Sequence, residues 1–401
     1  MADRELMASR LLVVDDDQAF GRLMKRAAEP CGYEVVATDD PRDVRRIVQT
    51  WRPAVIVLDL QIPGIDGIEL LRRLATDQCG AQLILASGVD GRTLEAALEL
   101  GRERGLKMAG TLAKPVDLQH VRELLEKFRP ADNGRLLHDL RAAIPLGQLF
   151  LEYQLKLDCQ TGRVTGVEAL VRWQHPTLGL VRPDRFIPLA EETCLIDPLT
   201  DWIAATAIRQ AASWHSQRFN LDVAINISAK NAQDIELPDR LARHCAECGV
   251  APASVILELT ETSAMRNAVQ LLDVLTRLRL KGFELAIDDF GTGYSSLVQL
   301  RRMPFSELKV DCSFVMRMTT DKECRFIVET LIDLAHKLGL RSVAEGVENA
   351  EALAALRAMG CDSAQGYYLS RPLPADRLAA FLKEHKELPA AATPRDASAA
   401  G

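Results

Sequence analysis

Short apolar segments alternate with amphipathic ones over the first third of the chain. Segments of this length and hydrophobicity are typical of buried parallel strands, and they occur at Leu11–Val14, Val55–Leu58, Leu83–Ala86 and Met108–Leu112. After the last of them, apolar residues recur at helical spacing from Leu118 to Phe128. The pattern predicts an α/β domain over residues 10–128, with a doubly wound (βα)5 sheet.

A polar break, RPADNGR at residues 129–135, follows this helical segment. It combines Pro, Asn and Gly, which interrupt regular structure, so we interpret it as a linker between domains. Beyond it, residues 136–386 form a second and longer series of strand and helix patterns. The two ends of the chain, residues 1–9 and 387–401, are expected to be flexible and disordered, respectively.

The composition excludes several classes of function. Lys and Arg number 49 against 56 Asp and Glu, and the net charge of −7 excludes the broad basic surface of a protein that binds nucleic-acid polymers. No apolar segment approaches the ~20 residues of a membrane span, and the N-terminus has no signal-peptide core. Nine Cys residues without a paired framework favour a reducing compartment. We therefore expect a cytoplasmic protein without a membrane partner.

One local cysteine pair, Cys245 and Cys248, has the CxxC spacing of redox and zinc sites. Zinc needs about four ligands, and no second pair accompanies this one. Because the surrounding stretch is helix-like, the pair is interpreted as ordinary helix residues.

Five polar side chains follow the predicted strands of the first domain. Ligands of a doubly wound sheet gather at the carboxyl edge of the strands, where we expect Asp15, Asp16, Asp59, Ser87 and Lys114. Three neighbouring carboxylates repel one another unless a hard cation such as Mg²⁺ neutralises them. A carboxylate beside Mg²⁺ and a lysine is equipped to accept a phosphoryl group, with Ser87 donating to its oxygens. Asp59 is the predicted acceptor.

The second domain repeats this arrangement on more strands. Seven strand-like segments have polar residues at or near their ends, which predicts a barrel of the TIM type, (β/α)8, with one site at its carboxyl face. The predicted site residues are Glu168, Asn226, Glu258, Asp288, Asp289, Lys309, Asp311, Glu345 and Gln365.

Six carboxylates and an amide in one cup would repel strongly without cations. An all-oxygen ligand set favours two Mg²⁺ or Mn²⁺ ions over zinc. Two such ions suit phosphodiester hydrolysis, because they offset substrate charge and activate water. Glu345 lies outside the main ligand set and is the candidate general base. Lys309 would hold the water, and Arg172, on the same strand face as Glu168, would bind a phosphate.

Each of these motifs taken singly also fits a structural role. Glu258 and Glu261 could begin a helix, and the stretch DDFGTGYSSL could be a capped glycine-rich turn. It is not a Walker loop, because it lacks the Gly-Lys-Ser/Thr ending that binds a nucleoside triphosphate. The ordered set as a whole favours function.

The first domain resembles the receiver domain of two-component response regulators. LLVVDDD, VIVLDLQIPGIDG, LASG and LAKP match the motifs of that family. The resemblance implies that a cognate histidine kinase phosphorylates Asp59, with Mg²⁺ held mainly by Asp16 and Asp59. Thr111 stands where the family usually has an aromatic switch residue.

The second domain resembles the EAL domain of cyclic di-GMP phosphodiesterases. EALVRW, INIS, ELTE, DDFGTGYSSL, LKVD, AEGVE and QGYYLS match its motifs. The resemblance implies hydrolysis of cyclic di-GMP to linear pGpG, and a dimer or higher homo-oligomer. It also implies a set of roles: metal ligands at Glu168, Asn226, Glu258, Asp288, Asp289 and Asp311, the base at Glu345, Lys309 at the water, substrate contacts at Gln154, Arg172 and Gln365, and a loop anchor at Glu261. Leu155 replaces the proline of the family's YQP motif.

Two other functions remain open at this stage. The barrel could bind cyclic di-GMP without cleaving it, although no predicted ligand or base is missing. The receiver could instead act as a scaffold that binds a kinase.

Overall fold

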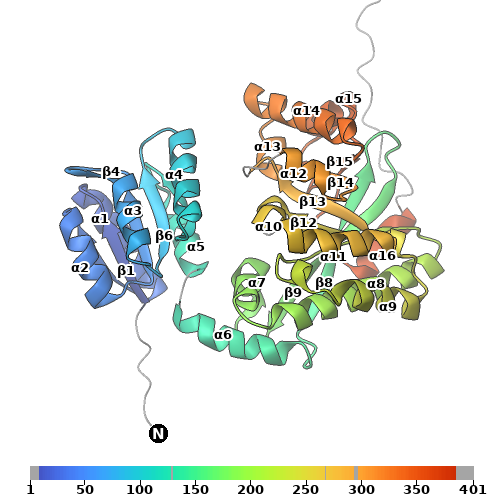
Figure 1. The fold of residues 1–401 in the computed structure, drawn as a ribbon, viewed down its shortest axis with the longest axis horizontal. Coiled ribbons are helices and arrows are strands. Elements are labelled where there is room, and N and C mark those ends of the chain that lie inside the picture. Colours follow the sequence, from blue (N-terminus) through green and yellow to red (C-terminus); the bar gives the residue numbers. More distant parts are fainter. Residues whose placement is uncertain (1–8, 128–129, 267, 293–296, 385–401) are drawn as a thin grey trace, which may run out of the picture. The chain divides into compact units, whose positions relative to one another are not determined.

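The computed structural model describes residues 9–127, 130–266, 268–292 and 297–384, in two compact units that divide between Asp139 and Leu140 (Figure 1). Of the chain ends expected to be flexible, residues 1–8 and 387–401 lie outside the described residues, whereas Ser9 begins the first strand. The last residues expected in the second domain, 385 and 386, are also outside them.

The first unit is a five-stranded parallel sheet in the order β2-β1-β3-β6-β7. These strands are β1 (Ser9–Val14), β2 (Tyr33–Thr38), β3 (Val55–Asp59), β6 (Gln82–Ser87) and β7 (Lys107–Ala113). The order is that of flavodoxin-like folds, and it confirms the predicted doubly wound class. The chain also forms a short antiparallel pair, β4 (Gln61–Ile62) and β5 (Ile65–Asp66).

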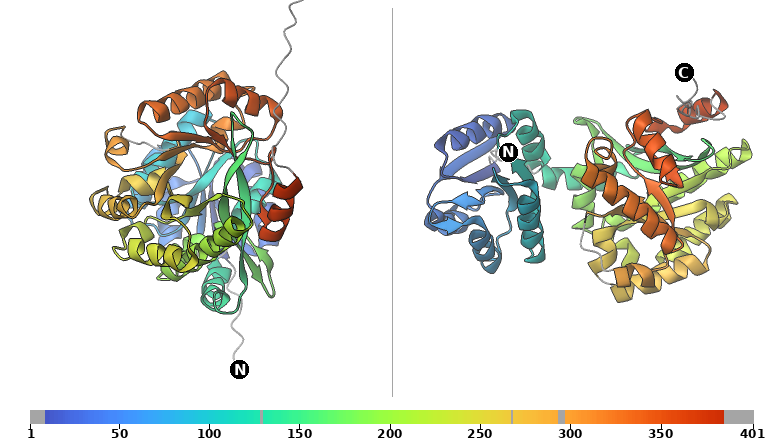
Figure 2. Two further views of the ribbon diagram at one scale, coloured as in Figure 1. Left: turned by 90° about the vertical axis from the view of Figure 1, so that its right-hand side faces the viewer. Right: turned by 90° about the horizontal axis from the view of Figure 1, so that it is seen from above.

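Helices cover both faces of this sheet (Figure 2). One face packs on α1 (Gln18–Ala28) and α5 (Leu118–Lys127), through side chains such as Met24 and Val121. The other packs on α2 (Pro41–Trp51), α3 (Gly67–Thr76) and α4 (Gly91–Glu103), through side chains such as Leu70. Because both faces are covered, β1, β3 and β6 each contain four consecutive apolar residues, which made them recognisable in the sequence.

Two segments differ from the sequence pattern. The pattern names four strands of the sheet and misses β2, an edge strand with only one fully buried residue, Tyr33. Residues 130–135 of the expected linker are helical, because helix α6 (Pro130–Ala143) begins at Pro130; residue 129 lies outside the described residues. A proline is well tolerated in the first turn of a helix, so it starts this helix.

The second unit is a closed eight-stranded barrel, as predicted, with helices around its strands (Figure 2). Its strands are β8 (Leu149–Asp158), β9 (Val164–His175), β11 (Asp222–Asn226), β12 (Val255–Thr260), β13 (Glu284–Phe290), β14 (Glu307–Val310), β15 (Arg341–Ala344) and β16 (Ser363–Ala364). Closure occurs because β8 pairs with both β9 and β16. Both pairings are antiparallel, whereas the other barrel strands run parallel to one another.

Two short strands extend the barrel sheet, β10 (Gly179–Val181) and β17 (Leu373–Pro374). The helices are α7 (Pro183–Glu191), α8 (Ile196–Ser216), α9 (Leu237–Cys248), α10 (Glu261–Arg266), α11 (Ala268–Leu280), α12 (Leu297–Arg302), α13 (Cys312–Val315), α14 (Lys322–Lys337), α15 (Ala350–Ala358) and α16 (Ala375–Glu384). No helix in the described ranges is long and apolar enough to cross a membrane.

The cysteine pair at CxxC spacing lies in α9, as expected for helix residues. Cys245 is buried and Cys248 partly exposed, and both are free thiols. Neither belongs to any group of potential metal ligands among the described residues.

Candidate active site

The five polar residues expected at the receiver site gather at the carboxyl edge of its sheet. Lys114 Nζ donates to Asp15 Oδ2 at 2.7 Å and to Asp59 Oδ2 at 2.6 Å. Oxygens of Asp15, Asp16 and Asp59 lie within 4.8 Å of one another, which suits one divalent cation. Burial raises the pKa of Asp15, although Lys114 opposes the shift. A carboxylate, a cation site and a lysine therefore meet at Asp59.

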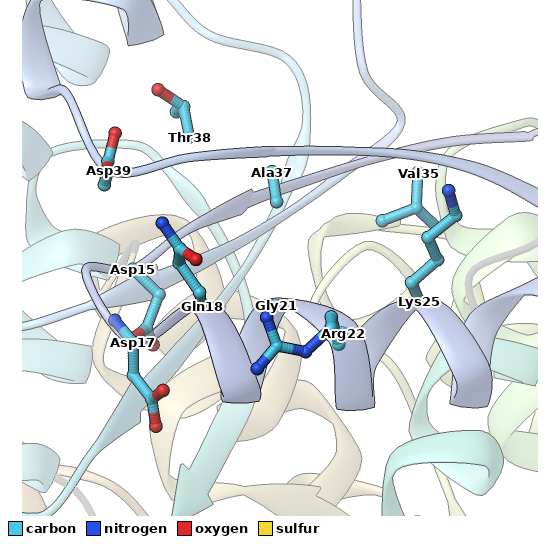
Figure 3. Close-up of a pocket in the computed structure, with 10 residues that line it drawn as sticks. All are labelled: Asp15, Asp17, Gln18, Gly21, Arg22, Lys25, Val35, Ala37, Thr38 and Asp39. Carbon is cyan, nitrogen blue, oxygen red and sulfur yellow. The ribbon is translucent and has the colours of Figure 1, made fainter.

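Two further features surround this site. Ser87 is fully buried at the end of β6, beside β7, which holds the half-buried Thr111. Phe20 of α1, which the sequence reasoning missed, places its ring 4.4 Å from Lys114 Nζ and so helps to orient the ammonium group. A pocket of about 420 Å³ opens beside Asp15, between α1 and β2, where Arg22 and Lys25 line it (Figure 3).

The barrel site is organised around one buried cation. Lys309 of β14 has no exposed surface, and its Nζ lies 2.7 Å from Glu258 and Glu345, 3.1 Å from Asp288 and 3.8 Å from Glu168. Burial alone would lower the pKa of Lys309, but these carboxylates raise it well above its usual value. The ammonium group stays charged and partly neutralises four acids on neighbouring strands.

Glu168 is held by two amides besides Lys309. Asn226 Nδ2 donates to Glu168 Oε1 at 2.7 Å, and Gln365 Nε2 donates to Glu168 Oε2 and, more weakly, to Gln154 Oε1. Burial would raise the pKa of Glu168, but Lys309 and the two amides lower it. Its carboxylate is thus fixed and ionised at the mouth of the barrel.

The paired aspartates lie near the end of β13. Asp288 ends the regular part of β13, and Asp289 has a left-handed backbone with φ of 54°, which turns the chain toward the glycine-rich stretch. Burial and the nearby Asp288 and Asp311 raise the pKa of Asp289 to about 6. Asp311 also caps α13, where its Oδ1 accepts from Ser313 N at 2.9 Å. Such clustered acids need a counter-charge.

The residues fit divalent metal ions. Oxygens of Asp288, Asp289 and Glu345 lie within 4.8 Å of one another, and the donors are oxygens, as Mg²⁺ and Mn²⁺ prefer. Glu258 Oε1 is buried and accepts no hydrogen bond from any described residue. A buried carboxylate oxygen that accepts no hydrogen bond favours a cation ligand.

Glu345 is less separate from the metal ligands than the sequence suggests. It was expected outside the main ligand set, yet it lies in one cluster with Asp288 and Asp289. It directly follows β15, so the strand that ends at Ala344 brings it to the same edge. Its role as the general base stays a prediction.

The predicted loop anchor has a defined partner. Glu261 is buried at the start of α10, and its Oε2 accepts a hydrogen bond from Gly291 N at 2.9 Å. Gly291 has φ of 103°, a conformation that favours glycine. Residues 293–296 of the DDFGTGYSSL stretch lie outside the described residues.

Arg172 lines an apolar pocket of about 380 Å³ beside Asn226. Its Nε donates to Glu152 Oε2 at 2.8 Å, and its Nη1 donates to Val171 O at 3.0 Å. Glu152 lies on β8 and was not identified from the sequence. The candidate phosphate contact is therefore already oriented by its neighbours.

A second buried ion-pair network lies deeper in the barrel, and sequence reasoning missed it. Lys156 Nζ donates to Glu307 Oε2 at 2.9 Å and lies 4.0 Å from Glu258 Oε1. Arg341 contacts the other oxygen of Glu307 at 2.8 Å. The sequence held one signal for this network. Lys156 comes two residues after Gln154 in the same strand, and alternate strand residues face the same side, so Lys156 should also point into the barrel.

The pKa values in this site predict how stability depends on pH. Burial raises the pKa of Glu258 to about 8 and that of Glu345 well above its usual value, although Lys309 opposes both shifts. The folded metal-free protein then holds protons that the unfolded chain has lost, so the contribution of Glu258 to stability falls as pH rises from about 4.5 to 8, and Glu345 acts in the same direction.

Thermal unfolding between pH 6 and 9, with and without Mg²⁺, measures this effect. We expect the melting temperature of the metal-free protein to fall over this range, and Mg²⁺ to stabilise the protein most at the alkaline end. A metal-free melting temperature that rises with pH would contradict the assignment of the raised pKa values.

Comparison with known proteins agrees with both units. The family model of the EAL domain matches residues 137–372 of the sequence. The family model of the response regulator receiver domain matches residues 11–126. Cyclic di-GMP phosphodiesterase RocR of Pseudomonas aeruginosa is 32% identical and aligns over 90% of this chain and 96% of its own length. Cyclic di-GMP phosphodiesterase NbdA of the same species is 44% identical over 66% of this chain.

The barrel also matches a solved structure, that of the P. aeruginosa MucR phosphodiesterase in complex with cyclic di-GMP. The TM-score is 0.59 and the identity 42%, over 61% of this chain and 99% of that one. The chain spans only about a third of the full length of NbdA (34%) and of the bifunctional diguanylate cyclase/phosphodiesterase MucR (36%). The similarity to RocR extends across both units, and the chain belongs to the EAL domain family, with a response regulator receiver domain ahead of its EAL domain.

Proposed function

We propose that this protein is a metal-dependent phosphodiesterase that hydrolyses cyclic di-GMP to linear pGpG and responds to phosphorylation at Asp59. One observation carries the proposal: an intact set of acids surrounds Lys309 at the mouth of the barrel. The names of RocR and NbdA, both cyclic di-GMP phosphodiesterases, support the substrate.

The metal ligands in this proposal come from five strands or their ends. Bound Mg²⁺ or Mn²⁺ would offset phosphate charge and lower the pKa of a water molecule. The residues that would hold two such ions are Glu168, Asn226, Glu258, Asp288, Asp289 and Asp311. Lys309 would keep the acids in place between catalytic cycles and orient the attacking water.

The other residues have roles on the substrate side. Glu345 would accept a proton from the water, because it follows β15 at the edge where the acids gather and its Oε1 contacts Lys309 Nζ, which would orient that water. The phosphates would be bound by Arg172, Gln154 and Gln365. The guanine bases would occupy the adjoining cavity that Arg172 and Asn226 line. Glu261 would hold the loop after β13 through Gly291.

Turnover is the direct test of the activity. Purified protein incubated with cyclic di-GMP and Mg²⁺ should yield linear pGpG, which chromatography separates from the substrate. Chelation of the metal should stop the reaction. Saturable binding of cyclic di-GMP without product would contradict hydrolysis and favour a binding protein.

The receiver supports a signalling partner. The Asp15, Asp59 and Lys114 arrangement fits phosphoryl transfer from a histidine kinase, with Mg²⁺ held mainly by Asp16 and Asp59. A homodimer or higher oligomer is part of the same proposal, on the basis of the family.

Beryllofluoride, which mimics a phosphoryl group, tests the regulatory role of Asp59. We expect it to change the rate of cyclic di-GMP hydrolysis by the wild type and to leave Asp59→Asn unaffected, because the variant lacks the acceptor carboxylate. Steady-state rates with and without the mimic measure this. The exposed Asp39→Asn is a control that should respond like the wild type. Equal wild-type rates would defeat the coupling, and altered kinase binding alone would favour a scaffold.

A further inference from the structure

The first strand of the barrel presents a row of polar side chains to the site. Lys156, Gln154 and Glu152 alternate along β8, and each contacts a side chain outside β8: Glu307, Gln365 and Arg172, respectively. The first pair belongs to the deeper ion-pair network, and the second lies beside Glu168. The third joins Arg172, the proposed phosphate contact, to Glu152, a residue without a role in the activity described so far.

The register of β8 and β9 explains this contact. Gln154 lies opposite Glu168, Glu152 opposite Leu170, and Phe150 opposite Arg172. Glu168, Leu170 and Arg172 share one strand face, so Glu152 is the diagonal neighbour of Arg172 on that face. The contact between Glu152 and Arg172 therefore follows from the antiparallel pairing of β8 with β9, which closes the barrel.

The contact uses only one edge of the guanidinium group. Of the five N–H groups of Arg172, one at Nε goes to Glu152 and one at Nη1 goes to Val171 O. In the described part of the chain, Nη2 donates to no protein group. The terminal nitrogens therefore remain available to a ligand in the cavity that Arg172 and Asn226 line.

The Glu152–Arg172 pair is partly shielded from solvent, so it can hold the Arg172 side chain in one position. The side chain of Arg172 is 17% exposed and that of Glu152 25% exposed, unlike the freely solvated pairs of the helix surfaces. A long arginine loses rotamer freedom when it binds a phosphate, and a group that fixes the side chain in advance reduces that cost.

We infer that Glu152 is a positioning residue for substrate binding: its carboxylate anchors Arg172 Nε so that the free edge of the guanidinium group faces a phosphate of the cyclic dinucleotide. The inference rests on the proposed function. Glu152 touches no reacting atom, and its effect is one of geometry. The negative charge of Glu152 by itself would weaken the binding of an anionic ligand. Loss of the anchor should therefore raise the KM for cyclic di-GMP, whereas loss of the charge alone should lower it.

Two substitutions separate position from charge. Glu152→Ala removes the anchor, and we expect the KM for cyclic di-GMP to rise about tenfold with kcat within about twofold, as for the loss of one charged hydrogen bond. Glu152→Gln keeps an oxygen that can accept a hydrogen bond from Arg172 Nε. The KM of this variant should therefore lie within about threefold of the wild-type value. Calorimetric binding of cyclic di-GMP in the presence of Ca²⁺ should show the same order of affinities.

Glu284→Ala is the matched control. Glu284 is also partly buried (22%) and pairs with an arginine, Arg279, at 2.8 Å, but it begins β13 at the opposite end of the barrel. The Glu284→Ala variant should have the same KM and kcat as the wild type.

Several outcomes would overturn the inference. These are an unchanged KM in Glu152→Ala, a loss in Glu152→Gln as large as in Glu152→Ala, or a lower KM in both variants. A wild type that neither binds nor cleaves cyclic di-GMP would overturn the proposed function and the inference together. If Glu152→Ala does not fold, Glu152→Leu, which keeps the strand packing, takes its place with the same expected rise in KM.

Discussion

Glu345→Gln should lower kcat for cyclic di-GMP by about 10²- to 10⁴-fold, the range expected when a general base is lost. Glutamine has nearly the same shape as glutamate but cannot accept a proton from water. Glu345 Oε1 lies 2.7 Å from Lys309 Nζ, a contact that the amide oxygen can also make. The affinity for cyclic di-GMP should therefore change little, which calorimetry with the inactive variant measures directly.

The test is sharpened by the position of Glu345 among the acids. Because its carboxylate lies in one cluster with Asp288 and Asp289, the affinity for Mn²⁺ must be measured as well. An unchanged Mn²⁺ affinity with lost turnover supports a base, whereas a parallel loss supports a ligand. Glu348→Gln, an exposed residue of the same loop, should behave as the wild type. Comparable losses of turnover and substrate affinity would refute the role as base.

Lys309→Met should destabilise the metal-free protein by about 3–5 kcal/mol, the usual cost of removing one partner from a buried ion pair. The side chain has no exposed surface and its Nζ lies within 4 Å of four carboxylates. Methionine fills much of the same space, so the loss reports mainly the missing charge. Turnover should be lost as well, because the ammonium group that keeps the acids in place is missing.

Urea unfolding of the metal-free variant measures this change. Lys337→Met is the matched control: Lys337 pairs with Asp333 at 2.6 Å, but both side chains are largely exposed (73% and 65%). Exposed pairs contribute little, so the control should lose under ~1 kcal/mol. Equal free energies of unfolding for Lys309→Met and the wild type would contradict a stabilising role of the Lys309 ammonium group in the metal-free protein.

Strand ends explain why so much of the site was predictable. Parallel strands place residues far apart in sequence, such as Glu168 and Asp288, at one edge, and the order of the motifs then suffices to group them. Lys309 was identified in the same way. Its contacts with four acids were not, because they depend on how side chains from different strands cross the barrel interior.

Features that depend on non-local pairing could not be predicted. Glu152 and Lys156 look like ordinary polar residues of a strand, and their partners Arg172 and Glu307 follow only from the register of the closed barrel. The same holds for α6, whose polar composition favoured a linker although its backbone is helical. Composition reports solvent exposure better than it reports backbone conformation.

The antiparallel direction of β8 has a mechanical consequence. In a barrel whose strands are all parallel, the chain enters at the amino end, opposite the reaction. Here the first residues of β8, Leu149 and Phe150, pair with Trp173 and Arg172 at the carboxyl end of β9. The chain is thus attached at the rim where substrate would enter. Helix α6 therefore leads directly into the strand pair that holds Arg172.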